Sequence, residues 1–163
     1  VESKKIVSYL PERTYLDETQ KVSEAITLFE DFYKDFDRSR AISMLEKLNI
    51  DSNARIKTLS KGTKEKVQLI LVMSRRAKLY CLDEPIAGVD PAARDYILST
   101  IINNYEPDST ILISTHLISD VENILDEVVF IKNGHIVLKN DVEDIRFNQG
   151  KSVDVLFREV FKC

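Results

Sequence analysis

Short, almost wholly apolar runs alternate with stretches of helical periodicity along this chain of 163 residues. Such runs occupy residues 6–10, 79–82 and 110–114. Short strands that are apolar on both faces are typical of a parallel sheet covered by helices. The alternation therefore predicts an α/β fold with a parallel sheet, and we expect the strands at 79–82 and 110–114 to be buried.

A helical segment is expected between the first two strands. Apolar residues recur there at gaps of three and four, which places them on one helix face. They are Val22, Ile26, Phe29, Phe32 and Phe36, followed on a second helix by Ala41, Leu45 and Leu48. A further helix is expected to begin at Ser60 and to be buried along residues 67–73. The pattern predicts a helical subdomain at about 19–77, with 1–18 and 78–163 belonging to the α/β core.

The second half of the chain carries clear turn and helix signals. Asp90-Pro91 is typical of a helix start, because aspartate caps the helix and proline suits its first position. That helix is expected to run to about residue 104, with another at 117–125. Asn133-Gly134 predicts a two-residue hairpin turn. The tail from residue 141 is expected to be helical, broken near Gly150, with a one-sided apolar face over 153–161.

Composition excludes few function classes but restricts some. The formal net charge of −4 argues against nucleic-acid binding, which normally needs a basic excess. Cys81 and Cys163 have neither metal-ligand nor disulfide-framework spacing. The sequence has no signal peptide and no apolar stretch near the membrane-spanning length of about 18 residues. We expect a cytoplasmic chain that meets the membrane only through a partner.

Four glycines, at 62, 88, 134 and 150, are too few and too far apart for a phosphate-binding loop. Neither G-x-x-x-x-G-K-[ST] nor G-x-G-x-x-G can be drawn on the chain. The chain itself therefore lacks a glycine-rich cradle for nucleotide phosphates.

Two adjacent acids, Asp83 and Glu84, follow the apolar run at 79–82. Ligands of open parallel sheets gather at the carboxyl ends of the strands. Mg²⁺ prefers one or two carboxylates together with water and phosphate oxygens, so the pair is a candidate metal and water site. The alternative is that these acids merely begin an exposed turn before Pro85.

His116 follows the next apolar strand and is the second candidate. A histidine at the end of a strand can donate a hydrogen bond to developing charge. The alternative is an ordinary polar loop residue. The other histidine, His135, lies in the expected hairpin and is assigned to the surface.

Ser60, Lys61 and Gly62 open the third candidate site at the start of a helix. A helix N-terminus offers backbone N–H groups and a partial positive charge to an anion. The alternative is a simple serine cap, with Lys61, Lys64 and Lys66 on a solvated face.

In order and spacing, these features resemble the motifs of ATP-binding cassette (ABC) ATPases. Residues 60–62 resemble the signature segment, residues 79–84 the Walker B strand with its catalytic glutamate, and residues 87–90 the D-loop. His116 stands at the position of the switch histidine, and residues 7–12 resemble the strand that leads into the Q-loop. The resemblance covers about residues 5–139.

The resemblance implies an incomplete P-loop NTPase-like core with an inserted helical subdomain, and ATP and Mg²⁺ as cofactors. Asp83 is then expected to hold Mg²⁺ through water, Glu84 to polarise the attacking water, and His116 to contact the γ-phosphate. Ser60, Lys61 and Gly62 are expected to bind ATP held by a second cassette, arranged head to tail as a homodimer or heterodimer. Asp90 is expected to help join the two sites.

The sequence departs from the family pattern at several positions. Lys61 replaces the first glycine of the signature, and Thr63 replaces its glutamine. Glu12 falls where the nucleotide-contacting glutamine of the Q-loop belongs, and an ionised carboxylate cannot donate a hydrogen bond. The absent phosphate loop leads us to expect the C-terminal portion of a cassette, which does not hydrolyse ATP alone.

The function that the resemblance implies is ATP hydrolysis by an ABC transporter subunit. It would energise transport, with export of peptides or drugs as the expected role, through a transmembrane permease at the inner face of the cell membrane. No nucleic-acid partner is expected. Two alternatives remain: a soluble ABC-type ATPase not tied to transport, and a degenerate, non-enzymatic cassette that acts as a dimerisation module.

Overall fold

The computed structural model describes residues 2–162, without the side chains of Ala92 and Ala93. The chain forms two compact units, Val1–Thr115 and His116–Cys163, each with its own set of helices and strands. Cys163, one of the two cysteines considered above, and Val1 lie outside the described residues. The two units are taken in turn.

The first unit contains the predicted parallel sheet, in the order β1 (Val7–Leu10), β2 (Leu79–Asp83) and β3 (Thr110–Ser114). The α/β class is therefore confirmed. Ile6 is not part of the strand as expected, because the short helix α1 (Ser3–Ile6) precedes β1.

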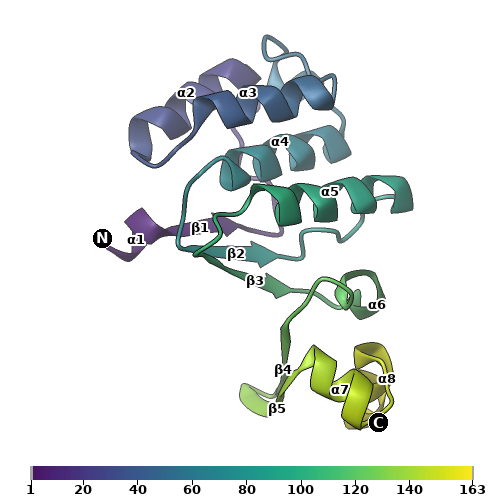
Figure 1. The fold of residues 1–163 in the computed structure, drawn as a ribbon. Helices are drawn as coiled ribbons and strands as arrows, with labels where there is room; N and C mark the ends of the chain where they lie inside the picture. The colour runs from purple at the N-terminus through teal and green to yellow at the C-terminus, as the bar shows by residue number, and fades with distance from the viewer. Residues whose placement is uncertain (1, 163) are drawn as a thin grey trace. The chain divides into compact units, whose positions relative to one another are not determined.

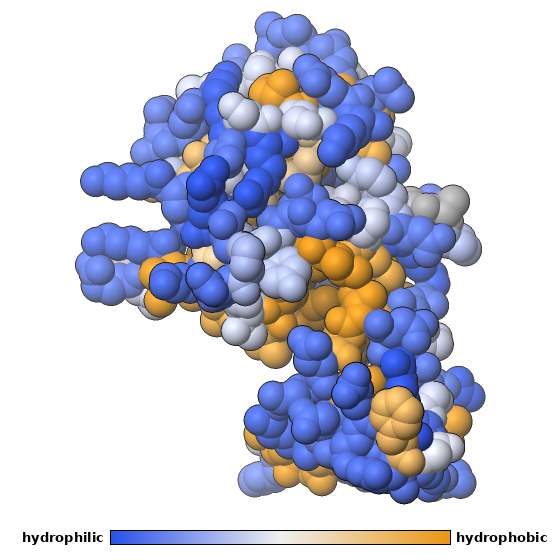
Figure 2. Space-filling view, viewed as in Figure 1, coloured by the Kyte–Doolittle hydropathy of each residue, from blue (hydrophilic) through white to orange (hydrophobic). Residues whose placement is uncertain are grey.

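One face of this sheet is buried and the other is open. Tyr80 and Leu82 are 0% and 1% exposed on the covered face. Register places Tyr9, Cys81 and Leu112 together on the opposite face, where Tyr9 is 54% and Leu112 59% exposed. The prediction of a fully buried strand at 110–114 is wrong, because the long helices of the first unit lie on one side of the sheet (Figure 1). Figure 2 shows apolar side chains at the surface around the sheet.

Helices of the first unit follow the predicted periodicity. They are α2 (Val22–Phe32), α3 (Arg38–Lys47), the 3₁₀ turn η1 (Ile56–Thr58), α4 (Lys61–Met73) and α5 (Pro91–Asn104). Val22 and Ile26 are buried, and every residue of α4 from 67 to 73 is buried. Phe32 is the exception, since its side chain is 75% exposed. The predicted apolar stripe therefore continues past the edge of the packed surface.

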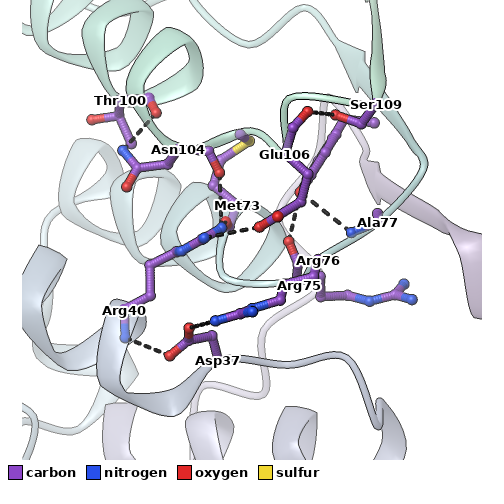
Figure 3. A network of polar contacts seen from close by, with 11 residues as sticks. Asp37, Arg40, Met73, Arg75, Arg76, Ala77, Thr100, Asn104, Glu106 and Ser109 are labelled. Carbon is purple, nitrogen blue, oxygen red and sulfur yellow. Dashed lines mark hydrogen bonds and ion pairs between the residues drawn. The ribbon is translucent and has the colours of Figure 1, made fainter.

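A polar network joins α3 to the ends of α4 and α5 (Figure 3). The Arg40 guanidinium donates to the carbonyl oxygens of Met73 and Asn104, at 3.5 and 3.0 Å, and pairs with Glu106 at 2.9 Å. Asp37 caps α3 by accepting from the Arg40 backbone N–H. Because carbonyls at a helix C-terminus lack intrahelical partners, Arg40 satisfies groups that would otherwise need water.

The second unit contains α6 (Ile118–Val121), β4 (Glu127–Lys132), β5 (His135–Asp141), α7 (Val142–Asn148) and α8 (Val153–Val160). The predicted hairpin is confirmed: Asn133 and Gly134 both have positive φ, 51° and 78°, as a type I′ turn requires. The helix predicted at 117–125 is shorter, with only one regular turn. His135 is exposed, as expected.

The apolar face of α8 packs as predicted within this unit. Val153 and Leu156 are buried with Val128, Phe130 and Ile145. The Phe157 ring meets the Phe130 ring edge to face, with 5.3 Å between centroids. Across the described residues, no helix combines the length and the apolar character that crossing a membrane requires.

Candidate active site

The site begins where β2 and β3 end side by side. Asp83 and Ser114, the last residues of the two strands, are register partners, and the Glu84 backbone N–H donates to the Ser114 carbonyl at 2.9 Å. Two hydroxyls face the two acids: Ser114 Oγ donates to Asp83 Oδ1 at 2.5 Å, and Thr115 Oγ1 donates to Glu84 Oε2 at 3.4 Å. Parallel register therefore places a hydroxyl beside each carboxylate.

Glu84 has a backbone conformation that is unfavourable for a residue with a side chain. Its φ is +47°, in the left-handed region, which costs an L-residue roughly 1–2 kcal/mol. The Ala87 N–H donates to the Glu84 carbonyl at 3.1 Å and closes the turn that follows. Strain of this kind is concentrated at functional sites, where it fixes the direction of a side chain.

A cavity of about 30 Å³ lies beside these acids. Glu12, Asp83 and Glu84 all line it, with Glu65 from α4. The space suffices for about one or two ordered waters, which polar walls would hold. The structure thus brings together three of the acidic residues that sequence reasoning selected, from two segments about 70 residues apart.

Gln68 holds the loop that carries Glu12, and sequence reasoning missed it. Its side chain is 3% exposed. Nε2 donates to the Pro11 carbonyl at 3.2 Å, and Oε1 accepts from the Tyr15 N–H at 3.1 Å. The one signal in the sequence is a polar residue inside the apolar run 67–73, because a buried amide needs hydrogen-bond partners.

Ser60 caps α4, as expected from the alternative in which it is a simple serine cap. Its Oγ accepts from the Thr63 N–H at 3.2 Å, and its carbonyl accepts from the Lys64 N–H. A Cβ placed on Gly62 would meet nothing within 4 Å, so the helix start is open to approach. Cap and anion contact are compatible, because the earlier N–H groups of the first turn point along the helix axis.

The basic residues near this helix start do not form one solvated face. Lys61 is 85% exposed and lies 3.9 Å from Glu65. Lys64 instead forms an ion pair with Glu18, and its side chain is only 15% exposed. Of these two lysines, Lys61 is therefore the one whose charge is more available to an approaching anion.

Asp90 and His116 lie in different units. Asp90 precedes Pro91 at the start of α5, as predicted, and its carbonyl accepts from the Arg94 N–H at 3.1 Å. Gly88, in the turn before it, has φ +70°, a conformation that favours glycine. His116 is the exposed first residue of the second unit and is described with that unit alone.

The acids fit a metal ion that is shared with phosphate better than one caged by protein. Among the residues that the structure describes, no group of three or more His, Cys, Asp or Glu side chains is arranged to hold a metal ion. Mg²⁺ usually takes one or two carboxylates and fills its remaining positions with water and phosphate oxygens. Asp83, at a strand end with a hydroxyl beside it, fits that coordination.

Arg75 is a second residue whose importance the sequence did not reveal. Its side chain is 3% exposed and pairs with Asp35 at 3.0 Å. The guanidinium also donates to the carbonyls of Lys4, Lys5 and Val7. It lies 3.9 Å from the centre of the Tyr33 ring, a cation–π distance. Arg75 thereby fastens the start of β1 to the loop between α2 and α3.

Comparison with known proteins identifies the family of the chain. Residues 9–119 match a family model described as "AAA domain, putative AbiEii toxin, Type IV TA system". An uncharacterised ABC transporter ATP-binding protein of Methanocaldococcus jannaschii, MJ1023, is 32% identical over 85% of this chain and 55% of its own length. The chain belongs to the ATP-binding cassette family.

Other relatives share the same assignment. The linearmycin resistance ATP-binding protein LnrL of Bacillus subtilis is 28% identical over 61% of this chain and 33% of its own length. A solved structure of an ATP-binding subunit of an ABC transporter superposes on 98% of this chain and 70% of its own, with a TM-score of 0.84 and 28% identity. This cassette chain spans about half the length of the curated relatives it matches.

Proposed function

We propose that this chain belongs to the ATP-binding and ATP-hydrolysing subunit of an ABC transporter. The observation that carries the proposal is the pair of acids at the end of β2. Asp83 and Glu84 each accept a hydrogen bond from a hydroxyl, that of Ser114 at the end of β3 and that of Thr115 just after it, and both acids share a small cavity with Glu12. In phosphoryl transfer, such groups position water and metal and stabilise charge.

Each residue has a distinct part in the proposed reaction. Asp83 holds Mg²⁺ through water, and the ion supplies neutralisation of phosphate charge when bound. Glu84 accepts a hydrogen bond from the attacking water and orients it. His116 donates a hydrogen bond to the γ-phosphate. Asp90 contributes to the contact between paired sites, and Glu12 faces the same cavity as the two acids.

A second cassette is the proposed partner at the start of α4. The Ser60 cap, the Lys61 charge and the open approach to Gly62 support binding of the γ-phosphate of ATP held by that partner. The phosphate loop absent from these 163 residues is proposed to be supplied by the remaining part of the complete cassette.

A transmembrane permease is the second proposed partner, which would place the cassette on the cytoplasmic face of the membrane. A groove of about 620 Å³ between β1 and α2 supports this proposal. Its lining is mainly apolar and aromatic, and it includes Tyr9, Phe29 and the 75% exposed Phe32. Exposed apolar grooves of this kind favour docking of an apolar helix face.

Export of peptides or drugs is the proposed transport role. The relative named for linearmycin resistance supports it. Loss of the gene is expected to lower resistance to compounds of this class. Unchanged resistance to peptides and to drugs would argue against the proposed cargo and would leave the proposed ATPase activity unaffected.

Replacing Glu84 by glutamine in the complete cassette tests the hydrolytic proposal. E84Q keeps the size of the side chain but weakens its ability to accept from and orient water. Turnover should fall by about 10²–10⁴-fold, the usual contribution of such a group. ATP binding, measured by fluorescence of a nucleotide analogue, should persist.

Glu143→Gln, on the exposed surface of α7, is the matched control and should leave turnover unchanged. Retained turnover in E84Q would argue for the alternative in which Glu84 only begins a turn. A wild-type cassette that binds ATP but never releases phosphate would favour the non-enzymatic dimerisation module.

A further inference from the structure

The Ser114 hydroxyl contacts a functional carboxylate but has no evident task in holding the fold. Ser114 is exposed at the end of β3, and its Oγ donates to Asp83 Oδ1 at 2.5 Å. The backbone of Ser114 is already the register partner of Asp83 in β2, and its carbonyl accepts from the N–H of Glu84, the residue after that strand. The strand pairing therefore does not depend on the hydroxyl.

We infer that Ser114 is a positioning residue that presents the Asp83 carboxylate to the metal. The inference rests on the proposed function, in which Asp83 holds Mg²⁺ through water. A hydrogen bond to an ionised carboxylate is short and about twice as strong as one between neutral groups. By engaging Oδ1, the hydroxyl restrains the rotation of the carboxylate and leaves Oδ2 available to accept from a water that Mg²⁺ would bind.

The positioning effect follows from the cost of ordering a side chain. An aspartate that rotates freely loses conformational entropy when the metal binds. An aspartate that is already held in one orientation avoids that cost. Groups that orient a metal ligand commonly contribute about 10–100-fold to metal affinity. Because Ser114 is exposed, its removal leaves no buried polar group without a partner and should not unfold the chain.

Thr115 contacts Glu84 in the same way but more weakly. The distance from its Oγ1 to Glu84 Oε2 is 3.4 Å, against 2.5 Å for the Ser114 contact. A long hydrogen bond restrains its partner less. The inference is therefore restricted to Ser114 and Asp83.

Metal binding by the complete cassette tests this role without relying on hydrolysis. Mn²⁺ replaces Mg²⁺, the slowly hydrolysed analogue AMP-PNP replaces ATP, and electron paramagnetic resonance measures bound Mn²⁺. Ser114→Ala should weaken Mn²⁺ binding by about tenfold, whereas Ser114→Thr, which keeps a hydroxyl, should restore it. With ATP, Ser114→Ala should raise the half-saturating Mg²⁺ concentration by a similar factor, and Ser114→Thr should return it toward the wild-type value.

Two further variants separate the possible failures. Ser109→Ala removes a hydroxyl just before the start of β3, where it donates to the Glu106 carbonyl, and should not alter Mn²⁺ binding. Asp83→Asn should abolish the Mn²⁺ signal. If Asp83→Asn loses Mn²⁺ but Ser114→Ala binds it like the wild type, or if Ser114→Thr fails like alanine, the role of Ser114 is overturned while the proposed function stands. If Asp83→Asn still binds Mn²⁺, the proposed role of Asp83 is wrong and the inference fails with it.

Discussion

At the scale of single residues, backbone N–H groups stabilise some ionised side chains by hydrogen bonding. Asp37 illustrates this at the start of α3. The Arg40 backbone N–H and the Arg76 side chain both donate to its carboxylate, and these contacts lower the pKa of Asp37. Because the folded-state pKa is below the unfolded value, the contribution to stability is present above the unfolded pKa of about 3.8 and is lost as pH falls through the folded pKa.

Asp37→Ala is expected to destabilise the chain by about 1 kcal/mol at pH 7, the usual value for a lost helix cap. The difference from the wild type should shrink as pH falls from the unfolded pKa of about 3.8 through the lower folded pKa, because the wild-type carboxylate becomes protonated first in the unfolded and then in the folded chain. Urea unfolding followed by circular dichroism at several pH values measures it. Asp37→Asn keeps a capping oxygen without the charge and should lose less. A destabilisation of Asp37→Ala that does not change with pH would contradict the charge-based explanation.

At the scale of secondary-structure elements, helix α4 joins two parts of the candidate site. Ser60 caps its start, and Gln68, about two turns later, holds the loop around Glu12. A shift of this helix would therefore move the Glu12 loop and the Ser60 cap together. This connection between the loop and the helix depends on the buried side-chain amide of Gln68.

Gln68→Leu should lower the free energy of unfolding by about 1–3 kcal/mol. The leucine has nearly the volume of glutamine, but it leaves the Pro11 carbonyl and the Tyr15 N–H without their partner. Amide hydrogen exchange at Tyr15 should accelerate in the variant. Gln149→Leu, at an exposed position after α7, is the control and should change neither measurement. If the Tyr15 amide is protected from exchange as well as in the wild type, Gln68 does not hold this loop.

Helices and turns were predictable from the sequence where the pattern that indicates them lies within the element itself. Helical periodicity located α2, α3 and α8, and Asn133-Gly134 located the hairpin turn. The exposure of Leu112 was not predictable, because the covering of a sheet face depends on elements distant in sequence. The acids Asp83 and Glu84 were recognised from their position after an apolar strand. Their hydroxyl partners were not, because strand register is a tertiary property.

At the scale of the whole molecule, most of the candidate site belongs to one of the two units. The acids, the Glu12 loop and the α4 cap all lie in the first unit, which has its own sheet and buried helices. The sequence offers no glycine-rich loop to bind β- and γ-phosphates. Under the proposed function, the acids act on a phosphate group that a loop of this kind would hold.

The purified 163-residue chain should therefore show no ATP turnover, whereas the complete cassette should hydrolyse ATP. Phosphate release measures both, and E84Q in the short chain serves as the control for contaminating ATPases. Equal residual release from the wild-type and E84Q short chains would identify contamination, because removal of the proposed water-orienting carboxylate should change only authentic turnover. Turnover by the short chain that E84Q abolishes would show that it binds phosphates by another route, most directly through the N-terminus of α4 and Lys61.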